Sequence, residues 1–309
     1  MTYVLLLAGL ALLLISGEFL VRGGVSLAGY FRISPMVVGL TVVSFGTSAP
    51  ELVVSLDAAI MGHPDISLGN VIGSNISNIA LVLAITVIIT PFFVSRKEIV
   101  DDMIIMTGAF VLLLIMLIDL KFSRLEGFIL FALLVAYIYR SIRNDRKHLL
   151  ARPTDMKFSL PVSVLIIILS SLGLVAGADL LVKSAGDIAL RMGLSERIIS
   201  VTVIAVGTSL PELATSIMAA IRKENGISIG NVVGSNIFNV LAILGITASV
   251  KPYNIKDAGF NLDMYIMIGI ALLLILMVLH SSNARLSRWK GILLIMAYSC
   301  YLYVVFYAR

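Results

Sequence analysis

The sequence predicts an all-α integral membrane protein in which ten transmembrane helices form two inverted-topology repeats of five helices each. Three observations lead to this prediction: the scarcity of charge, an internal repeat, and an odd number of apolar segments in each half. Only 13% of the residues are charged and the mean hydropathy is +1.05, whereas soluble domains carry about 25% charged residues. Apolar stretches of roughly 20 residues favour helices over a β-barrel, whose strands are short and alternate in polarity.

Polar punctuation separates the apolar segments into ten expected spans. The first segment has no Lys or Arg before its apolar run, so we expect a permanent span and not a cleaved signal peptide. In chain order, the spans are expected at residues 2–28, 35–61, 67–90, 101–119, 125–142, 159–190, 196–221, 227–250, 261–281 and 289–308.

The longest polar stretch covers residues 140–157 and divides the chain almost in half. We therefore expect a first five-helix repeat over 1–143, a cytoplasmic linker over 144–158 and a second five-helix repeat over 159–309. The motifs described below occupy residues 39–80 of the first repeat and 200–241 of the second.

The distribution of Lys and Arg predicts the orientation. With the N-terminus outside, 15 of the 23 basic residues fall inside, and the central linker supplies 6 of those 15. We therefore expect a multi-pass protein of the cell membrane with both termini outside and the linker in the cytoplasm. The net charge of +5 is explained by such loops without a nucleic-acid partner. The single cysteine, Cys300, excludes an intramolecular disulfide and a Cys-rich metal site.

The chain matches itself when it is shifted by 161 residues. Residues 34–91 align with 195–252 without a gap, and 27 of the 58 positions are identical. Shared hydrophobicity does not produce matched Gly, Pro, Asn, Ser and Glu at fixed spacing. Because each half holds five expected spans, the second half enters the membrane from the opposite side. Inverted repeats of this kind are typical of secondary transporters, whose sites lie near mid-membrane between the repeats.

The first repeated motif is GTSAPE, which recurs as GTSLPE. Thr47 and Glu51 are four residues apart, so they share a helical face. Pro50 has no N–H, and the carbonyl of Gly46 therefore loses its helical partner. These features predict a broken helix that presents carbonyl, hydroxyl and carboxylate oxygens. A proline kink alone would not explain a mid-membrane glutamate, which costs about 2.5–3.5 kcal/mol when charged. The second copy supplies Thr208, Ser209, Pro211 and Glu212.

The second repeated motif, GNxxGSNxxN, adds hydroxyls and carboxamides. Its better ligand candidates are Ser74 with Asn78 and Ser235 with Asn239, each pair four residues apart. Asn70, Asn75, Asn231 and Asn236 are candidates for capping or pinning helices, and the glycines for close helix packing. Together the two motifs offer oxygen ligands only, which suits hard cations such as Ca²⁺, Mg²⁺, Mn²⁺ or Na⁺.

Both motifs resemble those of the cation/calcium exchanger superfamily, specifically its sodium/calcium exchanger branch of the prokaryotic type. The resemblance covers essentially the whole chain, and GTSxPE followed by GNxxGSN in each half is highly specific. Proton-coupled relatives tend to carry a GNxxE-type signature instead. The resemblance implies an antiporter in which the first and sixth spans slide past the rest to give alternating access.

The resemblance also implies a ligand set. Glu51 and Glu212 would be the central Ca²⁺ ligands, and Thr47 and Thr208 would add backbone carbonyls. Flanking Na⁺ sites would be formed by Ser48, Ser209, Ser74, Ser235 and the carbonyls of Ser44 and Ala205. Relatives often have at least one Asp at the positions of Asn78 and Asn239. Asn at both positions leaves a central charge of −2, and an amide still ligates through its oxygen.

The leading hypothesis is therefore Na⁺/Ca²⁺ antiport by alternating access, by a transporter and not an enzyme. The expected partners are Ca²⁺, Na⁺ and membrane lipid, with no cofactor, no nucleic acid and no obligatory protein partner. One alternative is H⁺-coupled antiport of Ca²⁺ or another divalent cation, with Glu51 and Glu212 taking protons. The other is a passive cation channel.

Overall fold

A computed structural model describes residues 2–146, 157–192, 207–255, 260–280 and 285–307. Within these ranges the protein is helical apart from two short β-ladders. Seven of the described helices are long and apolar enough to cross a membrane, and one bent helix pair adds an eighth candidate. The all-helical membrane architecture is confirmed at this level. The count of ten spans stays a prediction, because most of 193–221 is either outside the described residues or a short helix.

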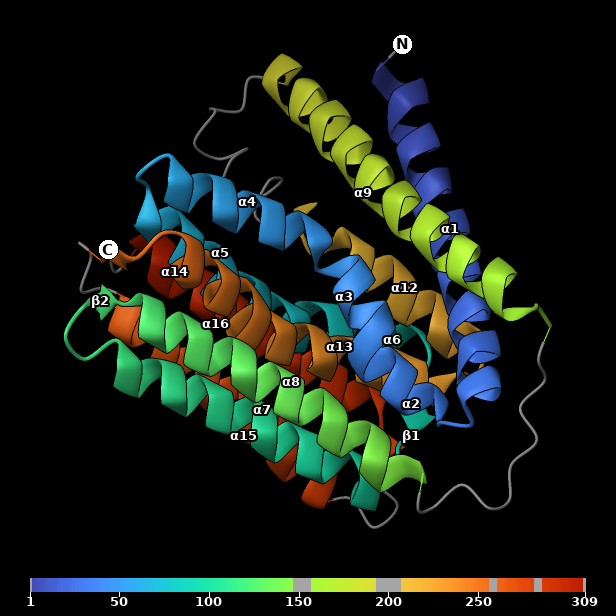
Figure 1. The fold of residues 1–309 in the computed structure, drawn as a ribbon. Coiled ribbons are helices and arrows are strands. Elements are labelled where there is room, and N and C mark those ends of the chain that lie inside the picture. Colours follow the sequence, from blue (N-terminus) through green and yellow to red (C-terminus); the bar gives the residue numbers. More distant parts are fainter. Residues whose placement is uncertain (1, 147–156, 193–206, 256–259, 281–284, 308–309) are drawn as a thin grey trace.

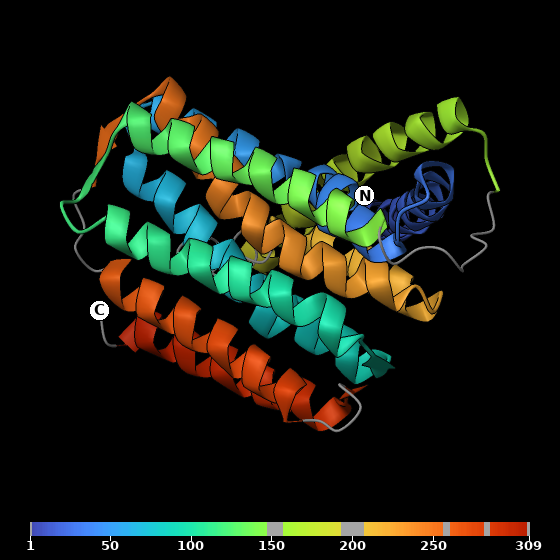
Figure 2. The same ribbon diagram turned by 60° about the horizontal axis from the view of Figure 1, so that its bottom comes forward.

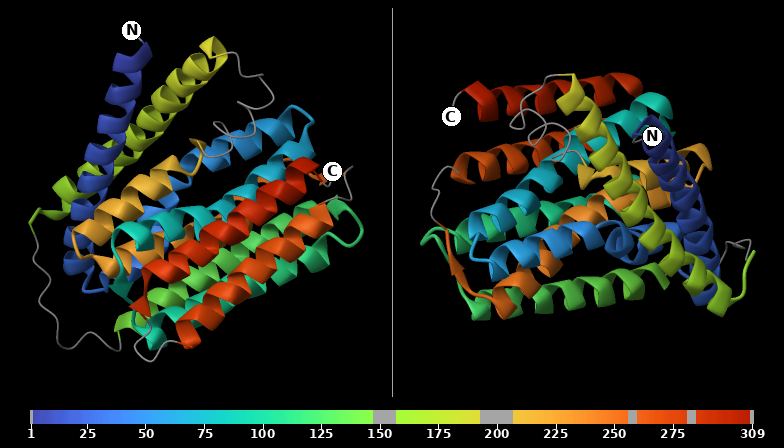
Figure 3. Two further views of the ribbon diagram at one scale, coloured as in Figure 1. Left: turned by 180° about the vertical axis from the view of Figure 1, so that it is seen from behind. Right: turned by 90° about the horizontal axis from the view of Figure 1, so that it is seen from above.

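Two long helices stand apart from the rest of the bundle. They are α1 (Thr2–Phe31) and α9 (Leu160–Arg191), which pack against each other along their length (Figures 1 and 3). Glycines allow this contact, since a Cβ on Gly9 would lie 2.9 Å from the Leu181 nitrogen and one on Gly177 would lie 3.0 Å from the Leu13 nitrogen. Small residues let helix backbones approach closely in membranes.

The second predicted span is a broken helix. It consists of α2 (Pro35–Val38), the π-helical turn η1 (Gly39–Val43), α3 (Ser44–Thr47) and α4 (Ala49–Ile60). The chain bends by 48° between α3 and α4, at Ser48. This confirms the break predicted from GTSAPE. In the second half, Ser209 has the same backbone conformation immediately before α12 (Leu210–Ile221), with φ −86° in both serines.

Two further helices form the buried centre. One is continuous through α5 (Pro64–Ser77), η2 (Asn78–Leu83) and α6 (Ala84–Ile89). The other is continuous through α13 (Asn225–Phe238), η4 (Asn239–Leu244) and α14 (Gly245–Val250). They run in opposite directions along the bundle (Figure 1). A π-helical turn begins at the equivalent asparagine in each, which the 3.6-residue periodicity of the sequence did not predict. Such turns are rare and occur frequently at functional sites.

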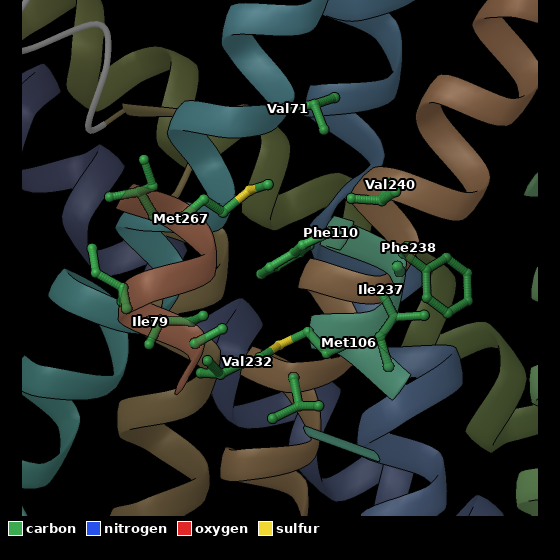
Figure 4. Close-up of a cluster of buried hydrophobic side chains, with 14 of the residues drawn as sticks. Val71, Ile79, Met106, Phe110, Val232, Ile237, Phe238, Val240 and Met267 are labelled. Atoms are coloured by element: carbon green, nitrogen blue, oxygen red, sulfur yellow. The ribbon is translucent and has the colours of Figure 1, made fainter. Parts of the chain in front are cut away.

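The remaining described helices surround this centre: α7 (Arg96–Met116), α8 (Arg124–Arg146), α15 (Phe260–Leu279) and α16 (Arg288–Tyr307). Figure 2 shows α8 on one side of the central helices and α15 with α16 on the opposite side. Apolar side chains from the central helices, α7 and α15 meet in one core (Figure 4). Its labelled members are Val71, Ile79, Met106, Phe110, Val232, Ile237, Phe238, Val240 and Met267. This core holds the two central helices in register.

Each β-ladder joins one half of the chain to the other. Strand β1 (Phe92–Phe93) pairs antiparallel with β4 (Arg285–Leu286), and β2 (Lys121–Phe122) pairs antiparallel with β3 (Tyr253–Asn254). Strands β1 and β2 lie at opposite ends of the bundle (Figure 1). The two halves are therefore tied together at both ends.

Candidate ion-binding site

Two glutamates lie at the centre of the molecule. Glu51 is in the first turn of α4, directly after the break at Ser48, and Glu212 is in the first turn of α12, directly after its N-cap Ser209. Both side chains are fully buried, and their charges lie close enough to repel each other. Among the residues that the structure describes, neither oxygen of Glu51 has a hydrogen-bond partner, and only one oxygen of Glu212 has one.

The GTSxPE motifs meet across the two halves. Ser48 donates a hydrogen bond from Oγ to Oε1 of Glu212, at 2.9 Å. The broken helix of the first half therefore reaches the carboxylate of the second half. Ser209, the equivalent of Ser48, is buried with its Oγ unpartnered among the described residues.

Thr47 connects the first motif of one half to the second motif of the other. Its Oγ1 lies 3.0 Å from Oδ1 of Asn231 and 3.3 Å from Oγ of Ser235, both on α13. The carbonyl oxygen of Ser44 is 3.2 Å away. Because a hydroxyl has one proton, the shortest of these contacts identifies Asn231 as the preferred acceptor. Thr208, the equivalent of Thr47, is only partly buried.

Asn78 and Asn239 occupy equivalent positions at the start of η2 and η4, and both are fully buried. Asn239 donates from Nδ2 to Oδ1 of Asn75 at 3.1 Å, whereas its own Oδ1 has no partner. Neither polar atom of Asn78 has a partner. Three amides are thus gathered between the central helices with several hydrogen-bonding groups unused.

The glutamate-bearing helices are pinned by two equivalent asparagines. Asn70 donates from Nδ2 to the Glu51 carbonyl at 3.2 Å and to Ser55 Oγ at 2.9 Å. Asn231 makes the same two bonds, to the Glu212 carbonyl at 3.3 Å and to Ser216 Oγ at 3.0 Å. The expectation that these asparagines pin helices is confirmed.

The structure buries most of the predicted ligand residues, and contacts between the two halves join Ser48 to Glu212 and Thr47 to Ser235. Several of their oxygen atoms have no partner among the described residues: Glu51 Oε1 and Oε2, Glu212 Oε2, Asn78 Oδ1, Asn239 Oδ1 and Ser209 Oγ. Ser44, Ser74 and Ser235 are also buried. Ala205 lies outside the described residues. A buried oxygen without a partner costs about 1–3 kcal/mol, more if charged, and a cation bound between such oxygens would remove that cost.

The chemistry of this region differs from that of a resident metal centre. Among the described residues, no group of three or more His, Cys, Asp or Glu side chains lies close enough to hold a metal ion. Two carboxylates among neutral oxygens suit a cation that is bound and then released, since a smaller ligand charge weakens binding.

Ion pairs form between residues four apart at equivalent positions of the two halves, Glu18 with Arg22 at 2.5 Å and Asp179 with Lys183 at 2.8 Å. Glu18 has a further partner. Arg222, which follows α12, donates from Nε to Oε2 of Glu18 at 2.8 Å. This ion pair ties α1 to the end of α12. No local pattern indicates it, because 204 residues separate the partners.

A second feature that sequence analysis did not single out is a buried aspartate in α7. Asp102 accepts a hydrogen bond from the Tyr137 hydroxyl of α8 at 3.2 Å, and it lines a cavity of 740 Å³ with Asp101, Arg140 and Asp145. The signal was present in the repeat. The segments DMIIMTG, starting at Asp102, and DMYIMIG, starting at Asp263, are identical at five of seven positions with the same shift of 161.

Comparison with known proteins gives a family match over nearly the whole chain. The family model described as sodium/calcium exchanger protein matches residues 1–143 and 162–307. A candidate antiporter named CaxA from Alkalimonas amylolytica is 36% identical over 98% of both chains. Sodium/calcium exchanger MaX1 from Methanosarcina acetivorans is 28% identical over 99% of this chain and 98% of its own.

Solved structures that resemble this chain over nearly its whole length belong to a sodium-calcium exchanger as well. The structure of the sodium-calcium exchanger NCX_Mj soaked with zero Na⁺ and Ca²⁺ superposes with a TM-score of 0.84, at 32% identity over 98% of each chain. The same protein soaked with Na⁺ and Sr²⁺ gives a TM-score of 0.83 at 33% identity over 97% of each chain.

Proposed function

The chain belongs to the sodium/calcium exchanger family, a family of antiporters and not of enzymes, and from this premise we propose that it exchanges Na⁺ for Ca²⁺ by alternating access. The observation that carries the proposal is the cluster of unpartnered oxygens around Glu51 and Glu212. Ca²⁺ takes about 6–8 oxygen ligands, and the two motifs supply carboxylates, hydroxyls, amides and carbonyls in that number.

Charge explains why the two ions would compete. Two ionised glutamates give a charge of −2, which one Ca²⁺ or two Na⁺ neutralise. A Ca²⁺ ion would bind between Glu51 and Glu212 with the carbonyls of Thr47 and Thr208. Na⁺ would use the hydroxyls of the flanking Ser48, Ser209, Ser74 and Ser235 and the carbonyls of Ser44 and Ala205. Binding of both ions to shared carboxylates couples their fluxes.

The inverted arrangement of the halves is part of the proposal. It is supported by the two β-ladders at opposite ends of the bundle and by the opposite directions of α5–α6 and α13–α14 (Figure 1). With both termini outside, the end of the molecule that carries Arg96, Arg140 and Arg222 faces the cytoplasm, and the linker 144–158 lies on that side.

The identity of the coupling ion is tested in proteoliposomes loaded with Ca²⁺. We expect an inward Na⁺ gradient to drive Ca²⁺ efflux, and a pH gradient without Na⁺ to leave efflux at the level of protein-free vesicles. Efflux driven by the pH gradient alone would establish H⁺-coupled antiport instead. Unitary currents in a planar bilayer, too fast for alternating access, would establish a channel.

A further inference from the structure

The two halves carry the same hydrogen-bonding groups, but only one of two equivalent contacts is made. Thr47 Oγ1 lies 3.0 Å from Asn231 Oδ1. Their counterparts under the shift of 161 are Thr208 and Asn70. No hydrogen bond joins this second pair, although both of its members are among the described residues.

We call each threonine–asparagine pair a corner of the site. The two corners also differ in how deeply their side chains are buried. Thr47 and Asn231 are fully buried, whereas Thr208 and Asn70 are both partly exposed. The first corner is therefore closed to solvent or lipid and the second is open. The difference is not one of sequence, since the residue types are identical in the two corners.

A second close contact joins α1 to α12. Gly17 of α1 approaches Ala214 of α12 so closely that a Cβ would lie 3.3 Å from the Ala214 carbonyl. About two turns further along the chain, Arg222, which directly follows α12, pairs with Glu18 of α1. The equivalent contact in the other half, between α9 and α4, is slight. The α1–α9 pair thus packs more extensively against α12 than against α4.

We propose that Thr47–Asn231 and Thr208–Asn70 are alternating partners, so that one hydrogen bond closes when the site opens to one side of the membrane and the other closes when it opens to the opposite side. The inference rests on the proposed alternating access. It assigns to Asn70 and Asn231 a positioning role in which Nδ2 holds the glutamate-bearing helix permanently and Oδ1 receives the threonine hydroxyl in one state only.

The geometry of the asparagines supports opposite-facing corners. Asn70 and Asn231 are each the seventh residue of their helices, α5 and α13. Because these helices run in opposite directions (Figure 1), the two residues lie towards opposite ends of the bundle. The Lys and Arg distribution predicts that the open Thr208–Asn70 corner faces outside.

Removal of each hydroxyl tests the proposal. Thr47→Val and Thr208→Val keep the side-chain shape and the backbone carbonyl. The measurement is Ca²⁺/Ca²⁺ self-exchange, with KM for Ca²⁺ determined at each membrane face in right-side-out and everted vesicles. The apparent dissociation constant varies inversely with the fraction of protein that is open to that face, so the ratio of the two KM values reports the balance of states.

We expect Thr47→Val to raise the ratio of KM at the Thr208 face to KM at the Thr47 face by about two- to tenfold, the range that one net hydrogen bond supplies. Thr208→Val should lower the ratio by a similar factor, and the double variant should return it towards wild type. Thr47→Ser and Thr208→Ser retain the hydroxyl and should leave the ratio unchanged. Shifts in the same direction for both valine variants, or no shift, would overturn the proposal.

A cross-linking experiment covers the case in which a valine variant does not fold. In a Cys300→Ser background, the pairs Thr47→Cys/Asn231→Cys and Thr208→Cys/Asn70→Cys are oxidised and assayed by gel shift after thiol alkylation. We expect the first pair to form a disulfide in ion-free protein and the second only in protein that is cycling Ca²⁺. Absence of the second disulfide during cycling overturns the proposal. Self-exchange does not depend on the coupling ion, so its complete absence in wild type would instead refute the proposed function.

Discussion

The first and second halves of this protein differ less in their residues than in what those residues touch. Each half contributes a helix, α4 or α12, with a buried glutamate in its first turn, and each has an asparagine that pins this helix through the same two hydrogen bonds. Yet Thr47 is fully buried and contacts Asn231 of α13, whereas Thr208 is partly exposed. Identical residues in two environments are what the proposed alternation between two states would produce.

A few differences between the halves are fixed by sequence. Arg222, which ties α12 to Glu18, is replaced at the equivalent position by Met61. Asp179, the equivalent of Glu18, is exposed and pairs only with Lys183. These differences bias the protein towards the state that is closed on the α12 side, in addition to the bias set by the threonine–asparagine contacts.

The largest expected effect is the same in both halves. Glu51→Gln and Glu212→Gln should each reduce Ca²⁺ exchange to background, because each removes one of the two carboxylates proposed to bind Ca²⁺. Radioactive Ca²⁺ uptake in proteoliposomes measures this. Either variant should unfold at a higher temperature than wild type in the absence of ions, since a buried charge without a partner is destabilising. Substantial exchange by one variant would show that the two halves are unequal at the centre.

The variants Asn239→Asp and Asn78→Asp should differ in how their exchange rates depend on pH. Asn239 donates to Asn75, and an aspartic acid can replace that bond only while it carries its proton. Exchange by this variant is therefore expected to fall as pH rises, by up to about tenfold per unit above the pH at which the carboxyl ionises. Asn78→Asp is the matched control, because Asn78 makes no such bond. Equal pH profiles for the two variants would contradict the assignment.

Arg222→Met makes the second half like the first at this position. Loss of the ion pair with Glu18 should cost about 1 kcal/mol, because the guanidinium is half-exposed, and it should shift the KM ratio between the two faces about fivefold towards the opposite state. Met61→Arg is the matched variant and should change the ratio little, since Asp179 is already paired and exposed. Vesicle KM measurements decide between these outcomes.

The smallest expected effect concerns a turn. Gly62 and Lys223 are equivalent, and both adopt positive φ, +84° and +63°. A lysine is strained there and a glycine is not. Lys223→Gly should therefore stabilise the protein by about 0.5–1 kcal/mol, and Gly62→Ala should destabilise it by about 1 kcal/mol, as measured by denaturation in detergent. Destabilisation by Lys223→Gly would show that the side chain has a packing role.

Local features of this structure were predictable from the sequence and non-local ones were not. Pro50 in GTSAPE predicts a break, and the chain bends at Ser48. Residues spaced by four predict the Arg22–Glu18 and Lys183–Asp179 pairs. By contrast, the bond from Ser48 to Glu212 depends on how the two halves pack, and that information is absent from either motif alone.

The π-helical turns and the β-ladders were missed for a different reason. The residues of η2 and η4 have ordinary helical composition, and the wider turn is imposed where Asn78 and Asn239 pack between the central helices. Strands of two residues have no period that a sequence pattern could reveal. The candidate ligands were found because they recur in both halves, and Asp102 with Asp263 would have been found by extending the same comparison along the chain.

The two β-ladders have a consequence for the origin of the molecule. Strand β1 of the first half corresponds to β3 of the second under the shift of 161. Strand β2 leads directly into α8 in the first half, and β4 leads directly into α16 in the second half. The pairing is therefore reciprocal: β1 of the first half pairs with β4 of the second, and β3 of the second half pairs with β2 of the first. This is the isologous contact of a two-fold symmetric dimer. Under the proposed inverted arrangement of two five-helix repeats, one ancestral repeat inserted in both orientations and dimerised through such ladders would have possessed both corners of the site before its gene was duplicated and fused.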